Sequence, residues 1–199
     1  NPARWRGHLD NLLPAPNKIK GEEHHPTVQV SEAGAFMRDL RAKDAMGARA
    51  LEFAMLTAAR SGEVRGAVWS EIDLDAKLWT IPAGRMKAGV EHREPLCKAS
   101  IRLLNALPRV KGSKLVFTSP RGGMLSDMTM SKLMKGMGYK ARDGRLAVPH
   151  GLRGTFKVWA QERTTYPREV IEMALSHALE NKVEAAYFDS DLLEKRARL

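Results

Sequence analysis

Length, charge and cysteine content limit what this protein can be. The 199 residues suffice for one hydrophobic core, and 43% hydrophobic residues is typical of a folded domain. With 33 Lys and Arg against 23 Asp and Glu, the net charge of +10 favours a polyanionic partner such as DNA or RNA. One cysteine, Cys97, excludes an internal disulfide framework and a CxxC zinc site.

The sequence also favours a particular cellular location and chain context. No apolar run reaches the ~20 residues that a membrane span needs, and no secretory pattern opens the chain. We therefore expect a cytoplasmic protein that does not insert into a membrane. Because the chain begins at Asn1 rather than Met, we expect it to be part of a longer protein.

Residues 13–26 (LPAPNKIKGEEHHP) have the composition of a linker, with three prolines and clustered charges. The residues before them would be the tail of another domain. His24 and His25 are adjacent and have no Cys or carboxylate at ligand spacing, so we expect a solvated loop there rather than a metal site.

Helical periodicity begins after this linker. Ser31 followed by Glu32 is typical of a helix cap, and Ala35, Phe36 and Leu40 predict an apolar helix face. A second helix, largely buried, is expected over residues 44–59.

The pattern then changes to short alternating or β-branched segments separated by Gly-containing turns. Segments 67–73, 77–83 and 91–96 predict a small three-stranded antiparallel sheet. The chain ends in further helical patterns over 98–108, 126–137, 150–162, 167–177, 180–188 and 191–199. The sequence thus predicts an α+β fold that is mostly α-helical.

His150 and Arg153 form the first candidate site. They lie three residues apart at the predicted start of a helix, so they share one helix face. A helix start also presents free backbone N–H groups with positive partial charge. This combination suits an anion, above all a phosphate.

Other reactive side chains stand at the ends of predicted elements. Arg60 follows the buried helix, and Glu63 is placed to hold its guanidinium. Lys87 is expected at the tip of the hairpin between the second and third strands, and His177 closes a helix ten residues before Tyr187. Each of these residues, taken alone, also fits an ordinary structural role.

Taken in order, these residues resemble the catalytic domain of the tyrosine recombinases, the phage-integrase family. The resemblance covers residues 27–199 and rests on LTAARSGEVRGAVWSEID, HGLRGTF, EMALSH and AAYFDSDLLEKR, which are similar to prophage and genomic-island integrases. It implies the tyrosine-recombinase catalytic fold. Residues 1–26 are similar to the end of the family's core-binding domain and its interdomain linker.

The resemblance implies a role for each candidate, without a metal, ATP or other cofactor. Tyr187 would attack a DNA phosphodiester to give a 3′-phosphotyrosyl link, and His150 would accept the phenol proton. Arg60 and Arg153 would bind the non-bridging oxygens, with Glu63 supporting Arg60, and His177 would donate to the phosphate. Lys87 would protonate the departing 5′-oxygen.

The resemblance further implies a site-specific recombinase that integrates or excises a mobile element. Its partners would be double-stranded DNA attachment sites, three further copies in a homotetramer of the full-length protein, and DNA-bending and excision accessory proteins. Two alternatives remain open: a tyrosine-type DNA topoisomerase, and a non-catalytic DNA-binding regulator with the same fold. Asp189 departs from the basic residues that relatives place after the nucleophile, so we expect it to face solvent or another protomer.

Overall fold

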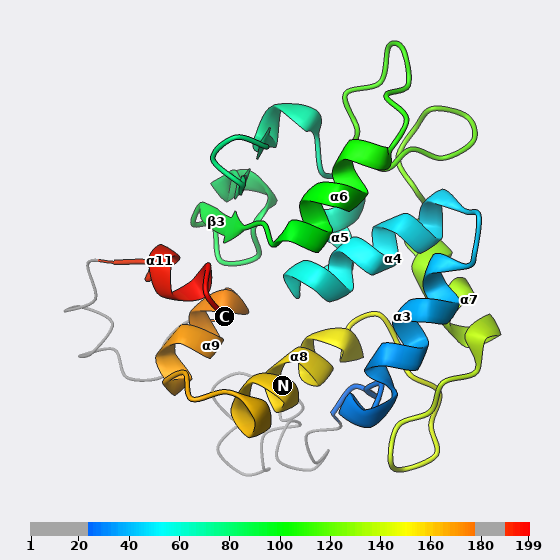
Figure 1. The fold of residues 1–199 in the computed structure, drawn as a ribbon. Helices are drawn as coiled ribbons and strands as arrows, with labels where there is room; N and C mark the ends of the chain where they lie inside the picture. Colours follow the sequence, from blue (N-terminus) through cyan, green and yellow to red (C-terminus); the bar gives the residue numbers. More distant parts are fainter. Residues whose placement is uncertain (1–23, 178–189) are drawn as a thin grey trace, which may run out of the picture.

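In the computed structural model, which describes residues 24–177 and 190–199, helix α4 (Met46–Thr57) lies at the centre of the fold (Figure 1). It is buried along most of its length, and its small residues, such as Gly47, Ala50 and Ala54, let neighbouring helices approach closely. The helices packed against α4 are α3 (Ala33–Arg41), α5 (Ser61–Arg65), α6 (Lys98–Ala106), α7 (Met128–Met137) and α8 (Gly151–Arg163).

An aromatic cluster joins α4 to the sheet. The ring of Phe53 lies 5.2 Å from that of Trp79 and 5.4 Å from that of Phe117, and all three side chains are fully buried. Aromatic side chains bury large apolar areas, so this cluster contributes strongly to the free energy of folding. It fixes the sheet against the helical core.

The sheet has the order β1–β2–β3, with all neighbours antiparallel. Its strands are β1 (Ile72–Asp73), β2 (Leu78–Ile81) and β3 (His92–Pro95). In the register, Trp79 pairs with Glu94 and Ile81 pairs with His92. The mostly helical fold with a three-stranded antiparallel sheet is therefore confirmed.

The prediction of a strand over the whole of 67–73 was wrong. Trp69–Glu71 form a 3₁₀ turn, and β1 is confined to Ile72 and Asp73. The backbone N–H of Val68 donates to a carboxylate oxygen of Glu71 at 3.3 Å, a local bond that favours a turn over a strand. Val68 pairs instead with Leu115, in an isolated antiparallel bridge.

The predicted helices within the described residues are present with shifted ends. Ser31 lies in a 3₁₀ turn (Val30–Glu32) and forms no cap, so α3 begins only at Ala33. Pattern 167–177 becomes α9 (Arg168–Ala174), and pattern 191–199 becomes α11 (Leu193–Arg196). Pattern 180–188 lies outside the described residues. The short helix α5 was not predicted.

The segment that precedes α3 packs against the start of α8. The carbonyl of Pro26 accepts the backbone N–H of Val148 at 3.1 Å, and the Thr155 hydroxyl donates to the carbonyl of Val28 at 2.7 Å. A Cβ at Gly151 would lie only 1.9 Å from the Pro26 oxygen. Glycine is therefore needed here because two backbones meet.

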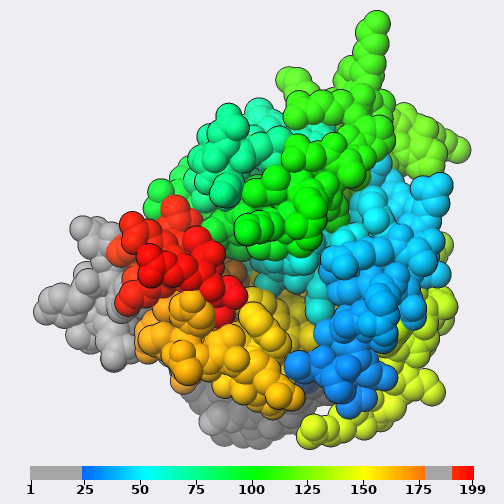
Figure 2. Space-filling model, in the orientation of Figure 1, coloured from blue at the N-terminus to red at the C-terminus, as the bar shows by residue number. Residues whose placement is uncertain are grey.

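The last ten residues pack between the sheet and α9, where they form one continuous patch of the surface (Figure 2). Leu199 packs against a small buried cluster that includes Ala160, Ile171 and Leu175. Among the helices of residues 24–177 and 190–199, none is long and apolar enough to cross a bilayer.

Candidate active site

Arg153 is the most deeply held of the candidate residues. It lies in the first turn of α8, is only 5% exposed, and donates to the carbonyls of Ala58 and Leu175. Its Nη2 also lies 3.1 Å from Nε2 of His177. A guanidinium has five N–H donors. Three contacts with described residues leave two donors for an anion.

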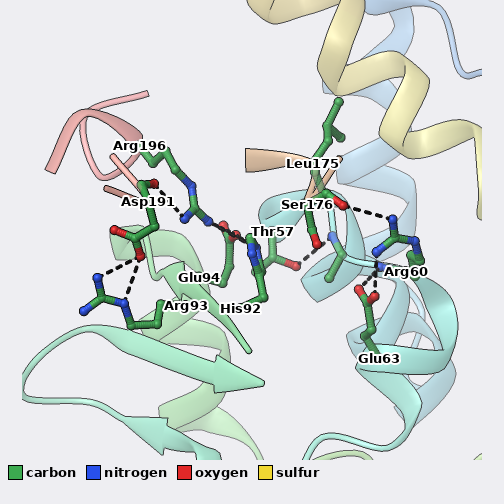
Figure 3. A network of polar contacts seen from close by, with 12 residues as sticks. Thr57, Arg60, Glu63, His92, Arg93, Glu94, Leu175, Ser176, Asp191 and Arg196 are labelled. Atoms are coloured by element: carbon green, nitrogen blue, oxygen red, sulfur yellow. Dashed lines mark hydrogen bonds and ion pairs between the residues drawn. The ribbon is translucent and has the colours of Figure 1, made fainter. Parts of the chain in front are cut away.

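Arg60 approaches the same region from the N-terminal end of α5. Its Nη1 lies 2.8 Å from a carboxylate oxygen of Glu63, and its Nη2 donates to the carbonyl of Ser176 at 3.4 Å (Figure 3). Glu63 is 5% exposed and also accepts the backbone N–H of Arg60 at 2.7 Å, which caps α5. The expected contact of Glu63 with the Arg60 guanidinium is present.

The carbonyls that hold the two arginines come from the ends of two helices. Ala58 ends α4 and Ser176 follows α9, and both have a left-handed backbone (φ 49° each) that non-glycine residues seldom adopt. The N–H of His177 bonds to the Glu172 carbonyl, and that of Ser176 bonds to the Met173 carbonyl. This is the Schellman ending, in which glycine usually takes the left-handed position. The strained ends direct carbonyl oxygens at the guanidiniums.

Opposing effects act on the charge of Arg153. Carbonyls at a helix C-terminus carry partial negative charge, which favours a cation. Burial, together with the like charge of Arg60, lowers the pKa of Arg153 to about 10. The side chain therefore stays protonated at neutral pH and remains a donor to an anion.

His150 stands immediately before α8, three residues from Arg153, as the sequence predicted. Its ring lies 4.3 Å from the ring of His25, measured between centroids. Partial burial, followed by the charges of His25, Arg153 and Arg60, lowers the pKa of His150 below its usual value. The ring is therefore neutral at pH 7 and available as a proton acceptor.

A groove of about 460 Å³ brings these residues together. It runs along α8 from Gly151 to Gln161, and its lining includes His25, His150, Arg153, Lys157 and His177. Sequence reasoning missed His25 and Lys157 as members of this site. Lys157 lies four residues after Arg153, so helical spacing alone indicated that it faces the same way.

Lys87 is not among the residues that line this groove. It is exposed in the connection between β2 and β3, as predicted, and it makes no hydrogen bond or ion pair with another described residue. Two residues earlier, Arg85 forms a short ion pair with Glu71 and donates to the Glu63 carbonyl. The base of the hairpin is thereby tied to the helix that presents Arg60.

Tyr187, Phe188 and Asp189 lie outside the described residues. Of the other two tyrosines, Tyr139 donates its hydroxyl to Asp39 at 2.6 Å, which raises the pKa of the phenol to about 12. Tyr166 lies in the connection between α8 and α9. Within residues 24–177 and 190–199, no group of three or more His, Cys, Asp or Glu is arranged to hold a metal ion.

Residues 191–196 are anchored on β3. Asp191 forms an ion pair with Arg93 at 2.8 Å, and Arg196 bonds both Glu94 and His92 at 3.1 Å (Figure 3). The Arg196 side chain is 1% exposed, so its pairing with Glu94 is a buried one. Breaking a buried pair is strongly destabilising, since it leaves an uncompensated charge.

Comparisons with known proteins place the chain in a family. Residues 27–193 match the Phage integrase family, and the chain belongs to it. Prophage integrase IntA of Escherichia coli (strain K12) is 34% identical over 181 residues, which are 88% of this chain and 42% of IntA. The chain thus spans less than half the length of this relative.

Two solved structures share the fold. The crystal structure of XerA recombinase superposes with a TM-score of 0.64 at 20% identity, over 96% of this chain and 70% of that one. A lambda integrase tetramer bound to a Holliday junction superposes with a TM-score of 0.61 at 19% identity, over 82% of this chain and 50% of that one. At these identities, the likeness establishes the fold.

Proposed function

We propose that this chain is the catalytic part of a site-specific tyrosine recombinase, which cleaves and rejoins DNA through a 3′-phosphotyrosyl intermediate to integrate or excise a mobile element. The observation that carries the proposal is that Arg60 and Arg153 donate to the consecutive carbonyls of Ser176 and Leu175. Arg153 also lines the groove, together with His150 and His177. Two fixed guanidiniums with free donors are suited to the non-bridging oxygens of one phosphate.

The remaining roles follow from the chemistry of phosphodiester cleavage. Tyr187 is the nucleophile, and neutral His150 accepts its proton. His177 donates to the phosphate, and Lys87, on its exposed hairpin, protonates the departing 5′-oxygen. The side chains supply the positive charge, and the phosphotyrosyl bond keeps the energy of the phosphodiester, so neither a metal nor ATP is required.

The partner is double-stranded DNA at attachment sites, in keeping with the net charge of +10. The full-length protein acts as a homotetramer, as the lambda integrase tetramer on a Holliday junction does. DNA-bending and excision proteins assist it, and it works in the cytoplasm on the nucleoid. Residues 1–26 end a core-binding domain and form the linker, and residues 27–199 form the catalytic domain.

The test uses the full-length parent protein and a nicked attachment-site duplex that traps the covalent intermediate. We expect a protein–DNA adduct that Tyr187→Phe abolishes while DNA affinity hardly changes, because one hydroxyl adds little to many phosphate contacts. Tyr166→Phe is the matched control and should retain the adduct. If the adduct survives Tyr187→Phe but disappears with Tyr166→Phe, Tyr166 is the nucleophile and the proposed role of Tyr187 is wrong.

Two further measurements separate this function from its alternatives. EDTA should leave adduct formation unchanged, and a loss that magnesium restores would contradict the mechanism. Relaxation of supercoiled DNA without a paired site would indicate a topoisomerase. DNA binding without any adduct would indicate a regulator.

A further inference from the structure

A carboxylate that the reaction above does not use stands behind His177. Glu172, in α9, is 8% exposed, and its two oxygens have different partners. Oε2 lies 2.7 Å from Nδ1 of His177, and Oε1 lies 2.6 Å from Nζ of Lys157. The carboxylate cannot rotate without breaking one of these contacts.

The two neighbours of the His177 ring select the same protonation state. A carboxylate accepts hydrogen bonds and does not donate them, so the nitrogen that faces Glu172, Nδ1, carries the hydrogen. A guanidinium donates and does not accept, so the nitrogen that faces Arg153, Nε2, presents a lone pair. The neutral ring is therefore held as the Nδ1–H tautomer.

Apart from Arg153 and Glu172, no residue that the structure describes makes a hydrogen bond to the His177 ring. The His177 side chain is 40% exposed at the end of α9, so solvent could satisfy its nitrogens in several orientations. The contact with Glu172 lies on the side away from Arg153, which leaves Nε2 directed at the proposed phosphate site. In an isolated histidine, either nitrogen can carry the proton.

We propose that Glu172 is a positioning residue, which fixes the orientation and the proton of His177 for the phosphate that Arg153 binds. This inference rests on the proposed function for its link to DNA cleavage. Its structural part, the control of the His177 ring by Glu172, concerns the protein without DNA.

The arrangement changes in a defined way when a phosphate arrives. An oxygen of the phosphate takes the place of Nε2 as acceptor for Arg153, and Nε2 takes up a proton from solvent in order to donate to the phosphate. The new positive charge on the ring is balanced by the negative charge of Glu172. The other charged groups around the pair are Arg153 and Lys157 from α8, Arg168 from α9 and Arg60 from the start of α5.

Burial opposes ionisation of Glu172, but the ion pair with Lys157 and the hydrogen bond from His177 outweigh it and lower the pKa of this carboxyl. Glu172 is therefore ionised at neutral pH before DNA binds. The carboxylate of Glu172 can therefore balance the positive charge of the His177 ring as soon as that ring is protonated.

The first test measures the ring of His177 in the DNA-free chain by ¹⁵N NMR, with His177→Gln to assign its signals among the six histidines. We expect hydrogen on Nδ1 and a bare Nε2 at a pH where the ring is neutral. Glu172→Ala should weaken this preference measurably, because only the Arg153 donor at Nε2 would still favour it. Glu172→Gln should preserve it, because the amide oxygen can still accept from Nδ1.

The second test measures adduct formation by the full-length protein. Glu172→Ala should slow cleavage about 10- to 100-fold, by analogy with the loss of a carboxylate that orients a metal-bound histidine. Glu172→Gln should also slow it, since the amide keeps the tautomer but supplies no charge to the protonated ring. Glu169→Gln, on the same helix, removes one charge without a contact to His177 and should leave the rate unchanged.

The outcomes separate the inference from the function beneath it. Hydrogen on Nε2 in the unmodified protein, or a His177 spectrum that Glu172→Ala does not alter, overturns the role of Glu172 whatever the activity. The expected spectra with no adduct from the unmodified protein would instead disprove the recombinase. Thermal unfolding of each variant shows whether a slow rate reflects a lost fold.

Discussion

The imidazole ring of His25 packs against that of His150, with centroids 4.3 Å apart and planes inclined by 59°. The two residues are far apart in the sequence, and one belongs to a segment with the composition of a linker. Both line the groove that contains Arg153 and His177. His25 therefore helps to set the environment of the proposed proton acceptor.

This contact predicts a pH effect. The pKa of His150 is lowered, so its ring stays neutral to a lower pH than that of an ordinary histidine. Adduct formation should therefore persist to a lower pH as well. His25→Ala removes one cause of the lowering and should move the acid limb of the pH–rate profile to higher pH. His24→Ala is the control, because His24 lines the groove without contacting the His150 ring.

NMR titration of His150 checks this prediction directly, and an unchanged midpoint in His25→Ala would contradict it. The lowered pKa of His150 also makes the free energy of unfolding depend on pH. A depressed pKa means that the unfolded chain binds the proton at higher pH than the folded one. The contribution of His150 to folding is therefore full above its unfolded pKa and is lost as the pH falls toward its folded pKa.

Lys87→Ala tests whether an exposed hairpin lysine is a general acid. The variant should slow cleavage of ordinary DNA severely, because the 5′-oxygen would leave as a poorly stabilised alkoxide. A substrate with sulfur at the bridging 5′ position needs little protonation, so the variant should cleave it at nearly the normal rate. Arg60→Ala should be slow on both substrates, since the non-bridging oxygens are unchanged.

Equal defects of Lys87→Ala on the two substrates would mean that Lys87 positions DNA and that another group donates the proton. The rates are best measured in a single turnover, which isolates the cleavage step from product release.

Gly151→Ala tests the close approach of Pro26 to α8. The added Cβ would lie 1.9 Å from the Pro26 oxygen, so one backbone must shift, at a cost of about 1–3 kcal/mol. Gly136→Ala in α7 is the control: its Cβ would meet nothing within 4 Å, and the change should stabilise the helix by about 1 kcal/mol. Urea unfolding measures both, and equal effects would argue against the contact.

Ser176→Gly tests the strained end of α9. Glycine adopts the left-handed backbone freely, so the change should raise the free energy of unfolding by about 0.5–1 kcal/mol after the entropy cost of glycine. The carbonyl that Arg60 contacts is kept, so adduct formation should continue. Ser176→Val should lower the melting temperature, and a variant as stable as the original would show that the position is not strained.

The sequence predicted the fold class because helical periodicity and strand alternation are local patterns, whereas the grouping of the candidate residues was implied by the family resemblance. Periodicity identified α8, and spacing placed His150 and Arg153 on one face. The strand prediction failed at residues 67–73, where Glu71 accepts hydrogen bonds from Trp79 and Arg85 as well as from Val68. Those partners lie 8 and 14 residues away, beyond the reach of strand alternation.

The parts of the site that the sequence did not predict depend on long-range contacts. The ring contact of His25 joins two segments that only the fold brings together. The bond between Glu172 and His177 requires the turn at Ser176, and serine gives no signal for the left-handed backbone there. Arg85 was overlooked because its partner at Glu63 is a backbone carbonyl, which no side-chain motif reveals.

Pro26 packs against Gly151, so the first described residues of the chain lie at the rim of the groove. Pro26 is clamped by α8, whereas its neighbour His25 is exposed and meets only the edge of the site. A displacement of His25 would therefore move the ring that packs on His150 without disturbing any buried residue, so the position of this exposed residue controls the environment of His150.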